Sequence, residues 1–228
     1  MRRVTWVLML VAGALVARAG DNELSEQEKK DGWILLFDGK SMEGWQGKDG
    51  TPVNDANVKE GTFNTMKNNG GYVPVYAKRK FSDFVLALDF KVSKGCNSGV
   101  FFRVTDPKDP VQTGFEIQVF DSFGRKVSKH EMGALYDAQE PSKNASKPAG
   151  EWQHMEITAV GNKVKVVLNG ETVNEADLDR WTEAGKNPDG TKNKFKTALK
   201  DMAKTGYVGV QDHGQDAWYK NVKIKEIK

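Results

Sequence analysis

The sequence has few of the residues that stabilise a protein through covalent or metal chemistry. Cys96 is the only cysteine among the 228 residues, so an internal disulfide is excluded. There are three histidines, and no spacing of histidine or acidic residues matches a metal site. The sequence therefore neither requires nor excludes a divalent cation. It has no internal repeat, heptad pattern or low-complexity tract. The fold must be stabilised by burial of a hydrophobic core.

Long apolar runs are also scarce, and the one that exists is typical of an export signal. Arg2 and Arg3 precede an apolar run at residues 4–16, and Ala-Arg-Ala at 17–19 forms a small-x-small site. We expect a signal peptide over residues 1–19, cleaved after Ala19. A membrane anchor is disfavoured because the run is shorter than the roughly 20 residues that span a bilayer. The sequence thus predicts export to a bacterial periplasm or to the exterior, without a membrane anchor after cleavage.

Excess positive charge is confined to that N-terminal segment. Its removal takes away Arg2, Arg3 and Arg18 but no acid, so the formal net charge falls from +3 to 0. The mature chain, 209 of the 228 residues, then has no basic patch. This balance argues against a nucleic-acid partner and against attraction to a membrane surface. The length suits a single domain.

Segments of alternating apolar and polar residues fill most of the mature chain. Examples are FVLALDFKV at 84–92, FEIQVF at 115–120 and WYKNVKIKEI at 218–227. Gly161-Asn162 and Asn169-Gly170 mark tight turns between such segments. Turn signals recur roughly every 8–12 residues, which is typical of all-β sandwiches. We therefore expect an all-β jelly-roll sandwich of two antiparallel sheets over residues 32–228.

Two segments depart from this strand pattern. Residues 20–31 are polar and predict a flexible leader. The stretch KFKTALKDMAK has the apolar spacing of a short amphipathic helix, expected near residues 193–203. We therefore expect the leader and this helix to lie outside the alternating strand pattern.

Polar side chains occupy an unusual place in the predicted strands. Side chains two residues apart on a strand point to the same face, so each strand has one core face and one opposite face. If four of the strands are neighbours, their opposite faces combine into one groove. Its members are Asp89, Phe101, Arg103, Glu116, Gln118, Tyr207, Gln211 and His213.

This combination of groups suits a sugar. Planar amide, carboxylate and guanidinium groups bind paired hydroxyls, and an aromatic ring takes the apolar face of a pyranose. The alternative is a solvated sheet face, which usually carries Lys, Thr and Ser. Arg103 could equally be a structural partner of Asp89 or Glu116. Asp121 would need a β-bulge to join the groove, because simple alternation sends it to the other face.

Six motifs, in order, resemble one bacterial family. They are GWILLFDGKSMEGW, GCNSGVFFR, TGFEIQVFD, GEWQHMEITAVGNKVKVVLNGE, NPDGTKNKFKTALKDMAKTGYVGVQDHG and WYKNVKIKEI. From residue 32 onward the chain resembles the 3-keto-disaccharide hydrolase family, formerly a domain of unknown function. The resemblance implies a concanavalin A-like sandwich, export and a role in sugar breakdown. It also implies functional positions at Asn97, Arg103, Glu116, Gln118, Gln211 and His213.

One strand invites a second comparison. Residues 116–121 read E-x-Q-x-x-D and resemble the E-x-D-x-x-E strand of laminarinase-type glucanases, with an amide in place of the middle acid. Direct hydrolysis of an unactivated glycoside needs two carboxyl groups about 5 Å or about 6.5–9.5 Å apart. A ketone at C3 relaxes this demand, because it makes the C2 proton acidic. A base can then remove that proton, the glycosidic oxygen leaves by elimination, and water adds afterwards.

The hypothesis for the site follows this chemistry. His213 or Glu116 serves as the base, and Arg103 lies near the developing enolate, where a divalent cation could replace it. Substrate-binding roles go to Gln118, Gln211, Asn97, Asp89, Asp121, Phe101 and Tyr207.

Two other functions remain open from the sequence. A carbohydrate-binding module with the same sandwich would bind sugar mainly through aromatic side chains and would tolerate loss of His213. A structural domain would have its groove filled by residues paired with one another, such as Glu116 with Arg103.

Overall fold

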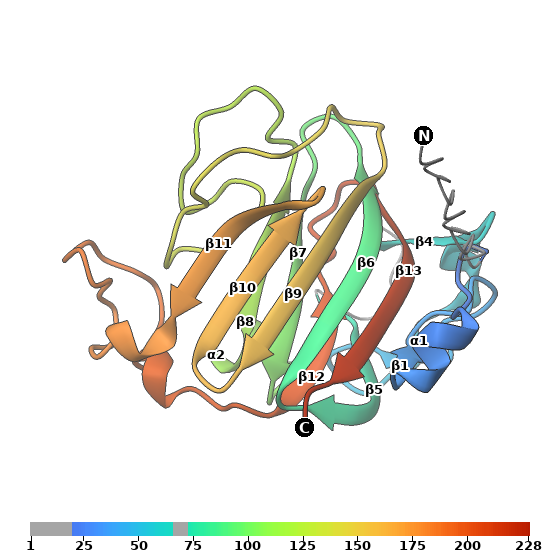
Figure 1. Cartoon of the computed structure of the whole chain (residues 1–228), viewed down its shortest axis with the longest axis horizontal. Coiled ribbons are helices and arrows are strands. Elements are labelled where there is room, and N and C mark those ends of the chain that lie inside the picture. Colours follow the sequence, from blue (N-terminus) through green and yellow to red (C-terminus); the bar gives the residue numbers. More distant parts are fainter. Residues whose placement is uncertain (1–19, 66–72) are drawn as a thin grey trace, which may run out of the picture.

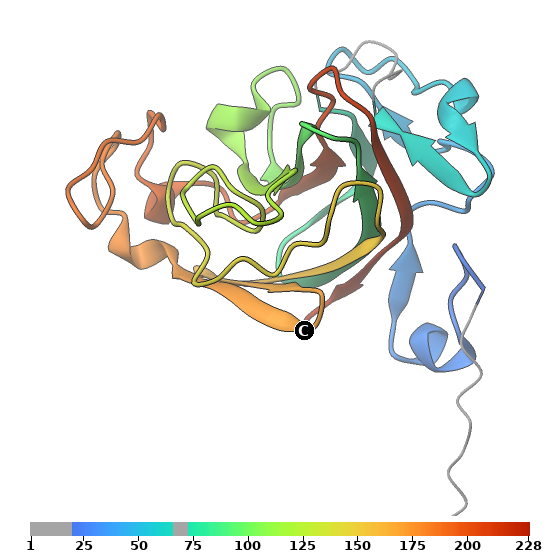
Figure 2. The ribbon, with the colours of Figure 1, turned by 90° about the horizontal axis from the view of Figure 1, so that it is seen from above.

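The structure, a computed structural model, describes residues 20–65 and 73–228 and consists of two packed antiparallel β-sheets. Figure 1 shows the larger sheet in front of the smaller one, and Figure 2 shows the two layers from above. The expected all-β jelly-roll sandwich is confirmed. The expected signal peptide, residues 1–19, lies outside the described residues.

The larger sheet has eight strands. In spatial order they are β11 (Glu171–Asp177), β10 (Lys163–Leu168), β9 (Gln153–Val160), β6 (Phe84–Val92), β13 (Ala217–Glu226), β4 (Thr62–Asn64) and β3 (Val58–Lys59), with β1 (Trp33–Leu35) also paired to β13. The smaller sheet has five strands. They are β2 (Trp45–Gln46), β5 (Val75–Phe81), β12 (Gly206–Val210), β7 (Asn97–Val104) and β8 (Phe115–Phe120).

Helical segments in the described residues are all short. They are α1 (Glu26–Lys30), α2 (Pro110–Thr113), and the 3-10 turns η1 (Asp55–Asn57), η3 (Leu178–Arg180) and η4 (Leu199–Asp201). Within residues 20–65 and 73–228, none has the length and apolarity needed to cross a membrane.

The core lies between the two sheets, where the alternating apolar residues meet. Phe90 of β6, Ile157 of β9 and Ile117 of β8 are fully buried there. Burial of such side chains contributes about 1.5–3 kcal/mol each. Ser98 of β7 and Tyr219 of β13 share a buried hydrogen bond of 2.8 Å, which links the two sheets inside this apolar layer. The tight turn at Asn169-Gly170 has positive φ at both residues, as expected for a two-residue hairpin.

The segment predicted to be a flexible leader has a defined place in the structure. Helix α1 begins with a capping box, in which Ser25 and Glu28 bond each other's backbone N–H groups. Asn22 is buried; its backbone N–H donates to Asn221 Oδ1 of β13 at 2.6 Å, and the backbone N–H of Asn221 donates to Asn22 Oδ1 at 2.8 Å. Residues 20–31 therefore contact the last strand through Asp21, Asn22 and Glu28.

The predicted helix near residues 193–203 is wrong, since only η4 forms there. The backbone N–H of Lys194 donates to Asp137 Oδ2 at 2.8 Å, and that of Lys196 donates to Gln112 Oε1 at 2.9 Å. These donors are bound by side chains from the β8–β9 loop and from α2, so they cannot form the ladder of an α-helix. Tertiary contacts override the local helical spacing.

Candidate functional site

The candidate site lies on the outer face of the smaller sheet, the face turned away from the core. In the β7–β8 register Gly99 lies opposite Gln118, and Phe101 opposite Glu116. The backbone N–H of Gln211, just after β12, donates to Gly99 O at 2.8 Å. Three adjacent strands thus bring Asn97, Glu116, Gln118 and Gln211 to one face, as the sequence predicted for the last three.

Glu116 is buried on this face, and Gly99 makes room for it. A Cβ placed at Gly99 would lie 2.2 Å from Glu116 Oε1, so only glycine leaves space for the carboxyl group there. Burial raises the pKa of Glu116 to about 8, against the opposing effect of the positive charge on Lys194. The carboxyl group therefore holds its proton at neutral pH and can serve as a general acid.

Gln118 provides an unused acceptor beside Glu116. Its Nε2 donates to Asn97 Oδ1 at 3.1 Å, while its buried Oε1 has no hydrogen-bond partner among the described residues. A buried acceptor without a donor costs about 1–3 kcal/mol. Such a group in a native structure calls for an external donor, and a substrate hydroxyl would supply one.

A loop segment runs beside β8 and adds residues that the sequence did not point to. Leu135 forms a bridge with Ile117, and the backbone N–H of Tyr136 donates to Glu116 O at 3.0 Å. Tyr136 therefore lies directly opposite Glu116, and their side chains share one face. The segment comes from the long loop between β8 and β9, drawn yellow-green in Figure 1.

Lys194 lies next to this pair. Its Nζ is 3.9 Å from the centroid of the Tyr136 ring, and its backbone is fixed by the hydrogen bond to Asp137. The Lys194 side chain is exposed to solvent on one side. Partial desolvation of its amine lowers the pKa of Lys194, although the negative charges of Glu116 and Asp137 oppose this shift.

The loop that carries Lys194 is built around a buried asparagine. Asn187 Oδ1 accepts hydrogen bonds from Trp181 Nε1 at 2.8 Å and from Asn193 Nδ2 at 2.9 Å. Its Nδ2 donates to Thr191 Oγ1 at 3.1 Å. These bonds fix residues 187–193 and hold Lys194 against Tyr136.

Glu116 and Lys194 together offer a proton donor and a potential proton acceptor on one face. A neutral amine can accept a proton while a protonated carboxyl group donates one, at the same pH. Elimination across two adjacent carbons needs these two events. The neighbouring amides supply hydrogen bonds that can hold a polyhydroxylated substrate.

Arg103 does not belong to this site, which corrects the predicted role near the enolate. A bulge in β7 places two residues opposite Val208 of β12, and Arg103 takes a positive φ of 55°. Its fully buried side chain donates to Ser82 O at 3.0 Å, Gly161 O at 2.7 Å and Asp83 Oδ1 at 3.1 Å. Arg103 ties the β5–β6 connection to the β9–β10 turn, and its acidic partner is Asp83 rather than Asp89 or Glu116.

Replacing Arg103 by Met is expected to lower the free energy of unfolding by about 2–4 kcal/mol, because buried acceptors lose their donor. Urea denaturation measures this loss. The matched control is Arg79→Met, whose exposed pair with Glu226 should contribute less than about 1 kcal/mol. Unchanged stability together with lost activity in Arg103→Met would contradict the structural role.

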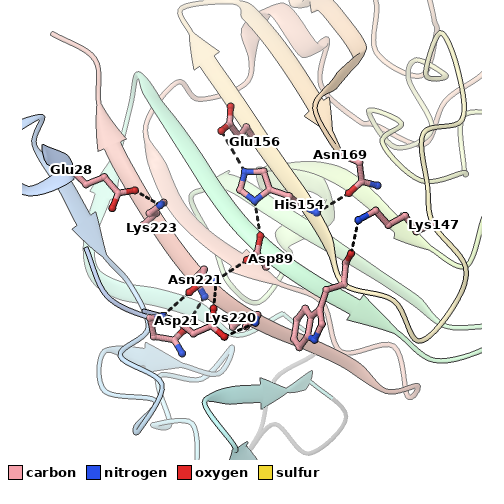
Figure 3. A network of polar contacts seen from close by, with 12 residues as sticks. Asp21, Glu28, Asp89, Lys147, His154, Glu156, Asn169, Lys220, Asn221 and Lys223 are labelled. Carbon is pink, nitrogen blue, oxygen red and sulfur yellow. Dashed lines mark hydrogen bonds and ion pairs between the residues drawn. The ribbon is translucent and has the colours of Figure 1, made fainter. Parts of the chain in front are cut away.

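Asp89 also lies elsewhere, because β6 belongs to the larger sheet. Figure 3 shows Asp89 between His154 and Asn221 on the outer face of that sheet. Its carboxylate bonds His154 Nδ1 at 2.6 Å and accepts from Asn221 Nδ2 at 2.6 Å. Burial would raise the pKa of Asp89, but these hydrogen bonds hold it below its usual value. The predicted position of Asp89 in the groove is wrong, because β6 belongs to the other sheet.

The predicted aromatic residues are packed rather than open. Phe101 is fully buried, in a small apolar cluster with Val73 and Val75, and Tyr207 packs against that cluster. The Lys80 ammonium lies 5.0 Å from the centroid of the Tyr207 ring. Phe101 has no exposed ring face for a sugar, which corrects its predicted role.

Two predicted residues lie in turns at the ends of strands. Asp121 follows β8, and its Oδ2 accepts a 2.9 Å hydrogen bond from the backbone N–H of Gly95 in the β6–β7 turn. His213 is exposed in the turn between β12 and β13, two residues after Gln211. Among the described residues, no group of three or more His, Cys, Asp or Glu side chains is placed to hold a metal ion.

Comparison with known proteins fits this geometry. Residues 32–225 match the family described as 3-keto-alpha-glucoside-1,2-lyase-like domain. The chain belongs to this family. The family resemblance expected from the sequence motifs is thereby confirmed.

Similar proteins occur in Bacteroides and Parabacteroides species. The chain is 31% identical over 231 aligned residues to the 3-keto-disaccharide hydrolase of Bacteroides thetaiotaomicron, an alignment that covers 86% of the chain and 79% of that protein. It also resembles two crystal structures of glycosyl hydrolase candidates from Parabacteroides distasonis. One has a TM-score of 0.74 at 30% identity, covering 86% of this chain and 99% of the other. The second has a TM-score of 0.74 at 27% identity, covering 92% and 100%.

Proposed function

We propose that this protein is a glycosidic-bond-cleaving enzyme that acts on 3-keto-α-glucosides, including 3-keto-disaccharides. The observation that carries the proposal is the pair of Glu116 and Lys194 on the outer face of the smaller sheet, beside the unused acceptor of Gln118. Family membership and the name of the Bacteroides relative support the substrate class.

The proposed reaction begins at C2 of the keto sugar. The neutral amine of Lys194 removes the C2 proton, and the electron pair forms an enolate with the C3 ketone. The enolate re-forms the ketone as the C1–O bond breaks, and Glu116 gives its proton to the leaving oxygen. Water can then add to the resulting enone, so that the net reaction is hydrolysis. General acid–base catalysis of this kind contributes about 10²–10⁴-fold.

Lys194 itself balances the negative charge that develops on the enolate in the proposed reaction. Lys194 becomes an ammonium ion when it takes the C2 proton, and its positive charge then stabilises the enolate by electrostatic attraction. This replaces the role that the sequence assigned to Arg103. Asn97, Gln118 and Gln211 position the sugar hydroxyls, and His213 lies at the edge of the site, where we place it as a substrate contact.

The outer face of the smaller sheet gives less support to a non-catalytic carbohydrate-binding module. Such a module would bind sugar chiefly through exposed aromatic rings. Phe101 is fully buried, and Tyr207 packs against the same apolar cluster of Val73 and Val75. The N-terminal sequence supports export of the enzyme, so we place the reaction in the periplasm or outside the cell.

The test is release of free aglycone from a 3-keto-α-glucoside and from the parent glucoside. We expect cleavage of the keto sugar, and at least about 10³-fold slower cleavage of the parent, whose C2 proton is not acidic. Equal cleavage of the two would contradict the elimination chemistry. A repeat with a chelator tests the divalent cation that the sequence left open.

A further inference from the structure

A row of tryptophan and lysine crosses the outer face of the larger sheet, on the side of the molecule opposite the Glu116 face. Trp218 of β13 lies directly opposite Lys91 of β6. Trp152 immediately precedes β9, the other neighbour of β6. The Lys91 Nζ is 5.2 Å from the ring centroid of Trp152 and 4.8 Å from that of Trp218. Three adjacent strands thus hold one ammonium group between two indole rings.

This row forms the floor of an open hollow of about 380 Å³, large enough for a sugar residue. Strands β3 and β4 form one wall, with Lys59 and Thr62, and Lys220 lies at the floor beside Trp152. A second hollow of about 230 Å³ shares Lys59, Thr62 and Trp218 with the first. The two hollows therefore adjoin each other.

Several hydrogen-bond donors that line this hollow have no acceptor among the described residues. Elsewhere in the molecule, the buried indole N–H groups of Trp45 and Trp181 donate to Leu36 O and Asn187 Oδ1. Trp152 and Trp218, in contrast, have no such acceptor among the residues that the structure describes.

The lysines show the same imbalance. Lys220 is paired with Asp21 at 2.6 Å, as Figure 3 shows. Lys59 and Lys91 make no ammonium hydrogen bond or ion pair within the described part of the chain. Three lysines and two acids, Asp21 and Glu60, line the hollow, so its net charge is +1. The hollow is therefore suited to a ligand that brings an anionic acceptor.

We infer that this hollow binds a uronic acid residue of an acidic polysaccharide. The indole edges and faces accommodate the apolar C–H surface of a pyranose. The ammonium groups of Lys91 and Lys59 bind the carboxylate, and Glu60 and Thr62 bind sugar hydroxyls. The hollow and the Glu116 site lie on opposite outer faces. A polysaccharide can therefore be bound in the hollow while the Glu116 site carries out its reaction. The inference does not depend on the proposed reaction.

Isothermal titration calorimetry of the whole folded chain with trigalacturonate and with neutral maltotriose tests the site. We expect trigalacturonate to bind at least about tenfold more tightly, and several-fold more weakly when salt rises from about 20 mM to about 300 mM. Lys91→Met and Trp218→Ala should each weaken binding about tenfold or more. Lys165→Met, an exposed lysine of β10 on the same sheet, is the matched control and should bind as the wild type does.

Three results would overturn the inference. They are equal affinity for maltotriose, undiminished binding by Lys91→Met, and no binding of trigalacturonate up to about 10 mM. Competition by acetate at equal concentration would show that only a carboxylate is recognised, and would remove the sugar from the proposal. Cleavage of a 3-keto-glucoside by Lys91→Met should match the wild type, which separates this site from the proposed reaction.

Discussion

Replacing Glu116 by Gln is expected to lower kcat/KM for a 3-keto-α-glucoside about 10²- to 10⁴-fold. The amide has nearly the size of the carboxyl group and fits in the space above Gly99, so the fold should be retained. It has no proton to give to the leaving oxygen. Steady-state kinetics measure the loss. Glu175→Gln, an exposed residue of β11 on the other sheet, is the matched control and should keep wild-type activity.

The pH profile of the wild type tests the same assignment without a mutation. Since the pKa of Glu116 is raised to about 8, kcat/KM should fall as the pH rises through that value and the acid loses its proton. The Glu116→Gln variant should lack this alkaline decrease. A wild-type rate that instead increased through about pH 8 would show that Glu116 acts as an ionised base.

The free energy of unfolding should also depend on pH through Glu116. The folded state keeps the Glu116 proton up to about pH 8, whereas an ordinary carboxyl loses it near 4.5. The stabilisation from this proton is therefore fully present below pH 4.5 and is lost as the pH rises through about 8. Relative to wild type, Glu116→Gln should gain about 2–4 kcal/mol between these limits, measured by urea denaturation. Parallel stability curves would contradict the buried position of the carboxyl group.

Alternation within a strand was enough to predict the central site strand. Residues 115–120 form β8 with the expected faces, so Glu116 and Gln118 point away from the core. The reason is local: the side-chain period of two is a property of a single strand. The same reasoning predicted the face of Gln211, whose backbone N–H donates to Gly99 O in the structure.

Pairing between distant strands could not be predicted in this way. Asp89 was expected in the groove because its strand alternates like the others, but β6 pairs with β9 and β13 in the larger sheet. Which sheet a strand joins depends on long connections and on the whole core. Alternation carries no information about either.

The bulge in β7 explains why the predicted position of Arg103 was wrong. The bulge in β7 and the positive φ of Arg103 turn its side chain from the outer face to the turns at Ser82 and Gly161. Strict alternation would have kept Arg103 beside Phe101. Arginine rarely takes a positive φ, so nothing in its residue type announces the bulge.

Lys194 and Tyr136 were missed because loops bring them together. They lie 58 positions apart in the sequence and meet through hydrogen bonds to Glu116 O and Asp137 Oδ2. Neither residue lies in a strand, so no periodic pattern includes them. Lys194 lies within one of the motifs shared with the family, whereas Tyr136 lies in none of them.

Replacing Lys194 by Met is expected to lower kcat/KM about 100-fold or more, because the residue that takes the C2 proton loses its amine. Methionine keeps much of the aliphatic length that packs on Tyr136, so the loop should stay in place. Lys196→Met, an exposed lysine in the same loop, is the matched control. In the wild type the rate should also fall at low pH as Lys194 gains a proton, and this acidic decrease should be absent in the variant.

Exchange of the C2 hydrogen with deuterium oxide separates the two halves of the reaction. Glu116→Gln should still exchange the C2 hydrogen, because its base is intact and only departure of the leaving group is slowed. Lys194→Met should lose exchange and cleavage together, since no enolate forms. If His213→Ala lost exchange while Lys194→Met kept it, His213 would be the base, and Lys194 would act only by placing its charge near the enolate.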